Sequence, residues 1–125
     1  MTIQNILIVD DSPTERHVLT ELLRANGYTV ATAETGEEAL EQIKTNPPHL
    51  VLMDVVMPCQ NGFQATRAIA RNPLTEHLPV IICTSKAQET DRIWGMRQGA
   101  RDYIVKPVDP ALLLQKIAAL SRSLA

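Results

Sequence analysis

Several features are scarce in this sequence, and each scarcity excludes a class of protein. The two cysteines, Cys59 and Cys83, lack the spacing of a zinc site, which favours reduced thiols over a disulfide framework. No apolar run approaches the roughly 18 residues that span a membrane. The residues before the first apolar run carry no lysine or arginine, whereas a secretory signal peptide would. We therefore expect a cytoplasmic protein that does not enter a membrane.

Positive charge is also limited. Lysine and arginine number 12 against 14 aspartates and glutamates, which gives a formal net charge of −2. This balance lacks the basic excess typical of proteins that bind nucleic acids or anionic membranes, so we expect neither partner. A hydrophobic content of 45% over 125 residues is ordinary for one globular domain.

What the sequence does contain is a regular alternation of two patterns. Short apolar runs predict strands, and longer stretches with apolar residues three and four positions apart predict helices. The predicted strands are residues 6–9, 28–33, 50–54, 80–83 and 102–105. The predicted helices begin after residues 12, 35 and 109 and cover about residues 63–71 and 90–98.

Residues at the helix starts support these assignments. Ser12 and Thr35 can each cap a helix, and Glu15 and Glu38 stand where they complete a capping box. Gly95 is less favourable, because a glycine inside a helix costs about 1 kcal/mol relative to alanine.

The alternation of strands and helices predicts an α/β fold. Strands that are apolar on both faces form parallel sheets covered by helices on both sides. Right-handed crossovers and polar strand ends indicate a doubly wound, flavodoxin-like sheet of five strands in the order 2-1-3-4-5. No segment is left over, so we expect residues 1–125 to form a single domain.

Polar residues follow four of the predicted strands: Asp10 and Asp11, Asp54, Thr84 and Lys106. Parallel strands present their carboxyl ends at one edge of the sheet, so we expect these side chains in one crevice. At roughly 5 Å and an effective dielectric near 20, two carboxylates repel by about 3 kcal/mol. Three carboxylates in one crevice therefore require a cation.

Mg²⁺ is the natural candidate, because it binds through carboxylates, waters and a phosphoryl oxygen. Together the groups suit phosphoryl transfer: Asp54 would attack phosphorus, while Mg²⁺ and Lys106 neutralise the phosphoryl oxygens. Thr84 would add a hydroxyl donor. Each residue alone has an ordinary structural interpretation, and only the combination predicts the site.

The same residues form a pattern that resembles the receiver domains of response regulators in two-component signalling. The resemblance covers essentially the whole chain. It implies a (βα)5 receiver fold, no output domain, and a signalling protein that catalyses its own phosphorylation and dephosphorylation rather than an enzyme with a separate substrate. It rests on Ile8-Val9-Asp10-Asp11-Ser12, Met53-Asp54-Val55-Val56-Met57-Pro58, Asn61-Gly62, Thr84-Ser85-Lys86, Gly99-Ala100, Tyr103 and Lys106-Pro107.

The resemblance implies a role for each residue of the site. Asp54 would be the phosphoacceptor, and Lys106 would contact the phosphoryl group. Mg²⁺ would be bound by Asp11, by Asp54, by the backbone carbonyl of Val56, and by Asp10 largely through water.

Other positions would form a switch. Thr84 would move toward the phosphoryl group, Tyr103 would follow it inward, and the bond before Pro107 would be cis. The output face would combine the fourth helix, fifth strand and fifth helix, where Arg92, Trp94 and Tyr103 lie. For Trp94, an exposed interface anchor and packing on its own sheet are both open.

A narrower resemblance, to PilH-type regulators, is carried by residues 12–15, 61–67 and 88–103. It implies a chemotaxis-like system that controls type IV pili and twitching motility, although similar sequences occur in phototaxis systems. The phosphoryl donor would be a histidine kinase or a histidine phosphotransfer protein. Output would be contact with a downstream protein or drainage of phosphoryl groups, by a monomer or weak dimer.

Other functions remain open. A binding scaffold that does not need phosphorylation would be expected to lose members of the acidic set, which is intact. A small aspartyl-phosphate hydrolase resembling the haloacid dehalogenases would carry Asp-x-Asp after its first strand, whereas Asp10 and Asp11 are adjacent. A flavin carrier is disfavoured by an aromatic content of 3%.

Overall fold

The computed structural model describes residues 2–56 and 62–124, which form five strands and five helices. The strands are β1 (Asn5–Val9), β2 (Thr29–Ala33), β3 (Leu50–Met53), β4 (Val80–Thr84) and β5 (Asp102–Val105). The helices are α1 (Pro13–Ala25), α2 (Gly36–Thr45), α3 (Gly62–Arg71), α4 (Glu89–Arg97) and α5 (Pro110–Leu124). Four of the residues discussed above lie outside the described residues: Met57, Pro58, Cys59 and Asn61.

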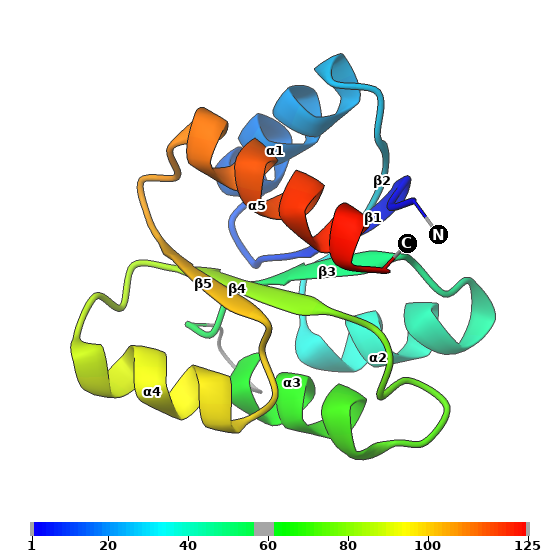
Figure 1. Cartoon of the computed structure of the whole chain (residues 1–125), viewed down its shortest axis with the longest axis vertical. Coiled ribbons are helices and arrows are strands. Elements are labelled where there is room, and N and C mark those ends of the chain that lie inside the picture. Colours follow the sequence, from blue (N-terminus) through cyan, green and yellow to red (C-terminus); the bar gives the residue numbers. More distant parts are fainter. Residues whose placement is uncertain (1, 57–61, 125) are drawn as a thin grey trace.

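All neighbouring strands of the sheet are parallel, and their order is β2-β1-β3-β4-β5. Helices α1 and α5 cover one face of the sheet, and α2, α3 and α4 cover the other (Figure 1). The predicted doubly wound, flavodoxin-like fold is therefore confirmed. Since β1 and β3 are adjacent, the residues that follow them meet at the carboxyl edge of the sheet.

Two apolar clusters hold the helices on the sheet, one on each face. Successive residues of a strand point to opposite faces, so Ile6 and Ile8 pack under α1 and α5 while Leu7 and Val9 pack on the α2 side. Strands β1, β3 and β4 are buried almost throughout, whereas β2, at the edge, is largely exposed. The three buried strands fix the backbone from which the site residues project.

Each of the two predicted capping boxes has one of its two hydrogen bonds, the one that the side chain of the capping residue accepts. Ser12 and Thr35 accept hydrogen bonds from the backbone N–H groups of Glu15 and Glu38, at 3.3 and 3.1 Å. The second bond of a capping box, from the N–H of the capping residue to the glutamate carboxylate, is replaced by other hydrogen bonds. Ser12 N–H donates to the Asp10 carboxylate at 3.0 Å, and the Glu38 carboxylate accepts from Glu34 N–H at 3.0 Å. At Ser12 the reason is a nearer acceptor, since Asp10 precedes it by two residues.

Gly95 allows α4 to lie close to the sheet. A Cβ atom at this position would stand 2.7 Å from Cδ1 of Ile82 and 3.2 Å from ring atoms of Phe63 and Tyr103. The glycine that disfavours the helix in the sequence is thus required by its packing.

Candidate functional site

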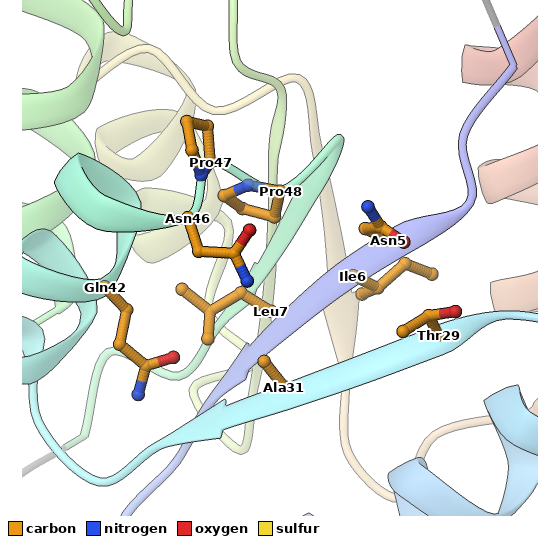
Figure 2. Close-up of a pocket in the computed structure, with 9 residues that line it drawn as sticks. All are labelled: Asn5, Ile6, Leu7, Thr29, Ala31, Gln42, Asn46, Pro47 and Pro48. Atoms are coloured by element: carbon orange, nitrogen blue, oxygen red, sulfur yellow. The ribbon is translucent and has the colours of Figure 1, made fainter.

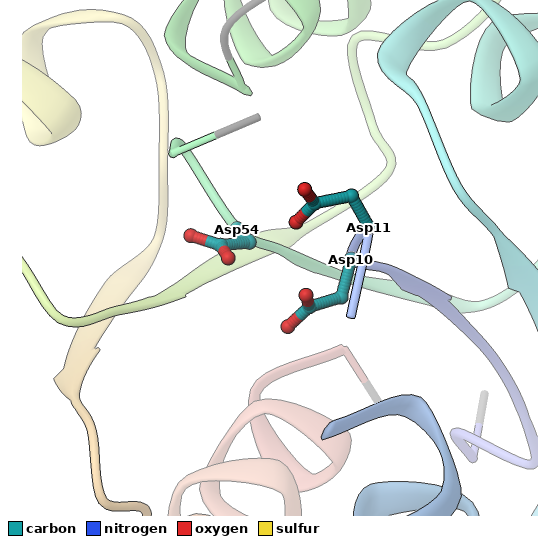
Figure 3. Close-up of side chains that lie close together, drawn as sticks. All are labelled: Asp10, Asp11 and Asp54. Atoms are coloured by element: carbon teal, nitrogen blue, oxygen red, sulfur yellow. The ribbon is translucent and has the colours of Figure 1, made fainter. Parts of the chain in front are cut away.

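Three carboxylates meet at the carboxyl edge of the sheet. Asp10 and Asp11 follow β1, Asp54 follows β3, and one carboxylate oxygen from each lies within 4.8 Å of the others. The three side chains project toward the same side (Figure 3). Asp10 and Asp54 are only 2% and 7% exposed, whereas Asp11 faces solvent. Burial of like charges at this spacing is the arrangement that a bound cation would stabilise.

Asp10 is held on several sides. Its N–H donates to the carbonyl of Ala33 at 3.1 Å, and its Oδ1 accepts from Ser12 N–H at 3.0 Å. Its Oδ2 accepts from Lys106 Nζ at 2.6 Å, and its backbone carbonyl accepts from Arg16 Nη1 at 2.7 Å. These contacts fix both the carboxylate and the backbone of Asp10.

Each carboxylate oxygen of Asp54 accepts a hydrogen bond from a different partner. Its backbone N–H continues the sheet by donating to Val9 at 2.9 Å. Oδ1 accepts from the N–H of Val56 at 3.0 Å, and Oδ2 accepts from Lys106 Nζ at 3.3 Å. Both carboxylate oxygens of Asp54 are thus held in place by hydrogen bonds.

Lys106 is the cation among these acids. Its side chain, 13% exposed, bridges Asp10 and Asp54 and lies 4.0 Å from Oε2 of Glu15. Partial burial lowers the pKa of Lys106, but the hydrogen bond to Asp10 and the charges of Asp54, Asp10 and Glu15 outweigh it, so the pKa lies above its ordinary 10.5. The ammonium group is therefore fully charged at neutral pH. The Lys106-Pro107 peptide bond is cis.

Thr84 and Tyr103 meet at a common neighbour, Lys86. Thr84 is fully buried at the end of β4, and its hydroxyl accepts from the N–H of Lys86 at 3.4 Å. The buried ring of Tyr103 places its hydroxyl 3.0 Å from the carbonyl of Lys86, to which it donates. Burial, followed by the charges of Asp91 and Asp54, raises the pKa of Tyr103, so the phenol stays protonated and can donate.

Arg92 and Trp94 lie outside this cluster, on the outer side of α4. Trp94 is 50% exposed, which decides between the two interpretations of this residue in favour of exposure. Arg92 pairs with Glu89 at 3.6 Å on the surface. Val105 on β5 and Leu112 on α5 are also exposed apolar side chains. Tyr103 belongs to this region by position, but its ring is buried.

Glu15 and Arg16 were not predicted to contribute to the site, and for Gly62, which is part of the receiver motif, the packing role was not predicted. A Cβ atom on Gly62 would lie 2.1 Å from the backbone oxygen of Asp54, so only glycine allows α3 to start against the end of β3. Glu15 and Arg16 occupy the first turn of the helix that follows Asp10 and Asp11. That position, directly after the acidic pair, is the signal that could have drawn attention to them.

Three cavities lie at the opposite end of the sheet from the acidic site. One, of about 100 Å³, opens where β1 and β2 begin, beside α2 and the connection to β3 (Figure 2). Two others, of about 320 and 330 Å³, share with it Pro47 and Pro48. None of these three is lined by a residue of the acidic site.

No helix within residues 2–56 and 62–124 has the length and apolar character needed to cross a membrane.

Comparison with known proteins identifies the family. The family model of the response regulator receiver domain matches residues 6–118. The chain belongs to this family. The prediction of a receiver domain is thereby confirmed.

Individual relatives support the same assignment. Protein PilH of Pseudomonas aeruginosa is 53% identical over 115 residues, which cover 92% of this chain and 95% of PilH. Response regulator PleD of Caulobacter vibrioides is 37% identical over 94% of this chain, which spans 26% of PleD. The crystal structure of a response regulator from Chloroflexus aurantiacus matches with a TM-score of 0.91 and 35% identity, over 96% of this chain and 98% of that one. The predicted similarity to PilH is therefore confirmed.

Proposed function

We propose that this receiver domain accepts a phosphoryl group on Asp54 within a cytoplasmic phosphorelay. The observation that carries the proposal is the position of Asp54 at the end of β3. There its carboxylate meets Lys106 at 3.3 Å and lies within 4.8 Å of Asp10 and Asp11. The Asp54 carboxylate, the Lys106 ammonium group and two further carboxylates thus share one site, in which Asp10 and Asp54 are buried and Asp11 is exposed.

The transfer would take place between a phosphohistidine and Asp54. An Asp54 carboxylate oxygen attacks phosphorus, and the bond between phosphorus and the histidine nitrogen breaks with its electron pair left on the imidazole, which then takes up a proton. Lys106 moves part of its contact from Asp10 to the new phosphoryl oxygens. Dephosphorylation is a separate reaction: water attacks phosphorus, the bond between phosphorus and the Asp54 oxygen breaks with its electron pair left on the carboxylate, and the proton of the attacking water leaves with inorganic phosphate.

Residues that fit Mg²⁺ surround Asp54. Asp10, Asp11 and Asp54 supply carboxylate oxygens, and the backbone carbonyl of Val56 would complete the protein's share. Among the described residues, the ligand atoms that converge here are carboxylate oxygens, which suit a hard cation. When bound, Mg²⁺ would neutralise negative charge on the phosphoryl oxygens.

The switch would run from Thr84 through Lys86 to the surface. The Thr84 hydroxyl accepts a long hydrogen bond of 3.4 Å from the Lys86 N–H, and a phosphoryl group at Asp54 would offer a charged acceptor to which the same hydroxyl can donate its proton. Tyr103 donates a hydrogen bond to the carbonyl of Lys86. Movement of the segment from Thr84 to Lys86 would therefore also move Tyr103 and change the surface formed by α4, β5 and α5. Arg92 and Trp94 would then belong to the surface that a downstream protein reads.

The identity of 53% with PilH supports a place in a motility system. We propose that the phosphoryl donor is a histidine kinase or histidine phosphotransfer protein of a chemotaxis-like pathway that controls type IV pili. Output would be contact with a downstream protein or removal of phosphoryl groups from that pathway.

Intact-mass measurement after incubation with acetyl phosphate tests the phosphoacceptor function. Wild type should gain one phosphoryl group in the presence of Mg²⁺ and none after chelation, and Asp54→Asn should gain none. A folded wild type that forms no adduct with Mg²⁺ would contradict the proposal and favour a scaffold that binds its partner unmodified.

A further inference from the structure

Arg16 is a partly buried cation beside the acidic site, and the proposed function assigns it no role. It lies in the first turns of α1, and its side chain is 16% exposed. Nη1 donates to the backbone carbonyl of Asp10 at 2.7 Å, and Nη2 donates to Oε1 of Glu34 at 3.2 Å. The planar guanidinium can serve both acceptors at once, because its donors point in fixed, divergent directions.

The carbonyl that Arg16 binds belongs to the peptide unit between Asp10 and Asp11. The orientation of this peptide sets the directions in which the two side chains leave the backbone. Before this peptide unit, the N–H of Asp10 donates a hydrogen bond to the carbonyl of Ala33. After it, the N–H of Ser12 donates to the carboxylate of Asp10. Arg16 holds the carbonyl between these two points.

Glu34 gives Arg16 a second anchor, on the connection from β2 to α2. That connection is itself fixed, because Glu34 N–H donates to the carboxylate of Glu38 at 3.0 Å. Arg16 therefore links the end of β1, the start of α1 and the start of α2. Both of these Arg16 hydrogen bonds are directed to structural partners, whereas those of Lys106 are directed to the Asp10 and Asp54 carboxylates.

We propose that Arg16 is a positioning residue for the Mg²⁺ site. It holds the peptide unit between Asp10 and Asp11 in the orientation that allows both carboxylates to bind the same cation. The inference rests on the proposed function, since it concerns the same metal site. Outer groups that orient metal ligands commonly change metal affinity by 10-fold or more when removed.

Positioning and simple electrostatics predict opposite effects of removing Arg16. Loss of a positive charge close to three carboxylates would tighten Mg²⁺ binding if Coulomb attraction alone mattered. Loss of a positioning contact would weaken it. A purely structural role would lower the melting temperature and leave the Mg²⁺ affinity of the folded protein unchanged.

The test is calorimetric titration of folded protein with Mg²⁺ in the absence of any phosphodonor. Arg16→Gln should raise the Mg²⁺ dissociation constant by about 10-fold. Arg16→Lys keeps the charge but lacks the planar guanidinium that donates to two acceptors, and it should raise the dissociation constant by a smaller factor. This variant provides the measurement if the glutamine variant does not fold. Arg24→Gln is the matched control: it removes the same charge from the exposed far end of α1 and should leave the constant unchanged.

The outcomes separate the two proposals. Unchanged or tighter Mg²⁺ binding by the Arg16 variants would overturn the positioning role while leaving the phosphoacceptor function standing. Absence of Mg²⁺ binding by wild type would instead contradict the proposed metal site itself.

Discussion

At the scale of single residues, Lys106 determines the electrostatic balance of the site. It contacts Asp10 at 2.6 Å and Asp54 at 3.3 Å, and both carboxylates are buried. Without a metal ion, this one ammonium group neutralises part of the charge that the fold brings together. Removing one partner of a buried ion pair is strongly destabilising, since it leaves charge without compensation.

Lys106→Met should therefore lower the free energy of unfolding by about 2 to 4 kcal/mol at neutral pH without Mg²⁺. The pKa of Lys106 is higher in the folded state than its ordinary 10.5, so the charged form is favoured by folding. Its contribution is fully present below 10.5 and is lost as pH rises through the folded pKa. Urea denaturation of wild type and variant should show a constant difference up to about pH 10 that narrows above it. A difference that does not change at high pH would contradict this assignment.

Cys83 offers a second test at the residue scale. It is buried in β4, and desolvation is the main cause that raises its pKa from 9.0 to about 12. In a Cys59→Ala background, Cys83 should react with a thiol reagent at neutral pH no faster than the protein unfolds, because thiolate is the reactive form.

Denaturant provides the control for this measurement, since it should make Cys83 react at once. Fast reaction of the native protein would show that the thiol is accessible. Because the folded pKa is raised, the neutral thiol contributes stability below about pH 9 that is lost as pH rises toward 12.

At the scale of elements, two glycines set how closely helices approach the sheet. Gly62 lets α3 begin against the backbone of Asp54, and Gly95 lets α4 pack on Ile82, Phe63 and Tyr103. Neither requirement can be recognised from local sequence, because it depends on residues distant in the chain. The helix caps show the same limit: Ser12 and Thr35 were predicted, but the acceptors used by the neighbouring N–H groups depend on the fold.

Gly95→Ala should destabilise the protein by about 1 to 3 kcal/mol, although alanine favours a helix by about 1 kcal/mol. The added Cβ atom would lie 2.7 Å from Cδ1 of Ile82, which is fully buried and has little room to move. Urea denaturation measures the change. The control, Arg97→Ala on the exposed side of the same helix, should alter stability by less than about 0.5 kcal/mol. An alanine at residue 95 that stabilises the protein would show that α4 can shift away from the sheet.

At the scale of the whole molecule, the alternation of strand and helix patterns was sufficient to predict the sheet order and the edge where the acids meet. Asp10, Asp11, Asp54 and Lys106 were predictable because each lies within two residues of the end of a strand, and parallel strands end at one edge. The contact of Arg16 with Glu34 was not, because both are ordinary charged residues until β2 is placed beside β1. The exposure of Trp94 likewise required the packed position of α4.

Of the three neighbouring aspartates, we propose that Asp54 alone accepts the phosphoryl group. Borohydride reduction followed by tandem mass spectrometry tests it most directly, because reduction of an acyl phosphate converts the modified aspartate to homoserine. After reaction with acetyl phosphate and Mg²⁺, we predict homoserine at residue 54 and unmodified Asp10 and Asp11, with no homoserine when Mg²⁺ is chelated. Homoserine at residue 10 or 11, or at no position in a folded protein, would contradict the account.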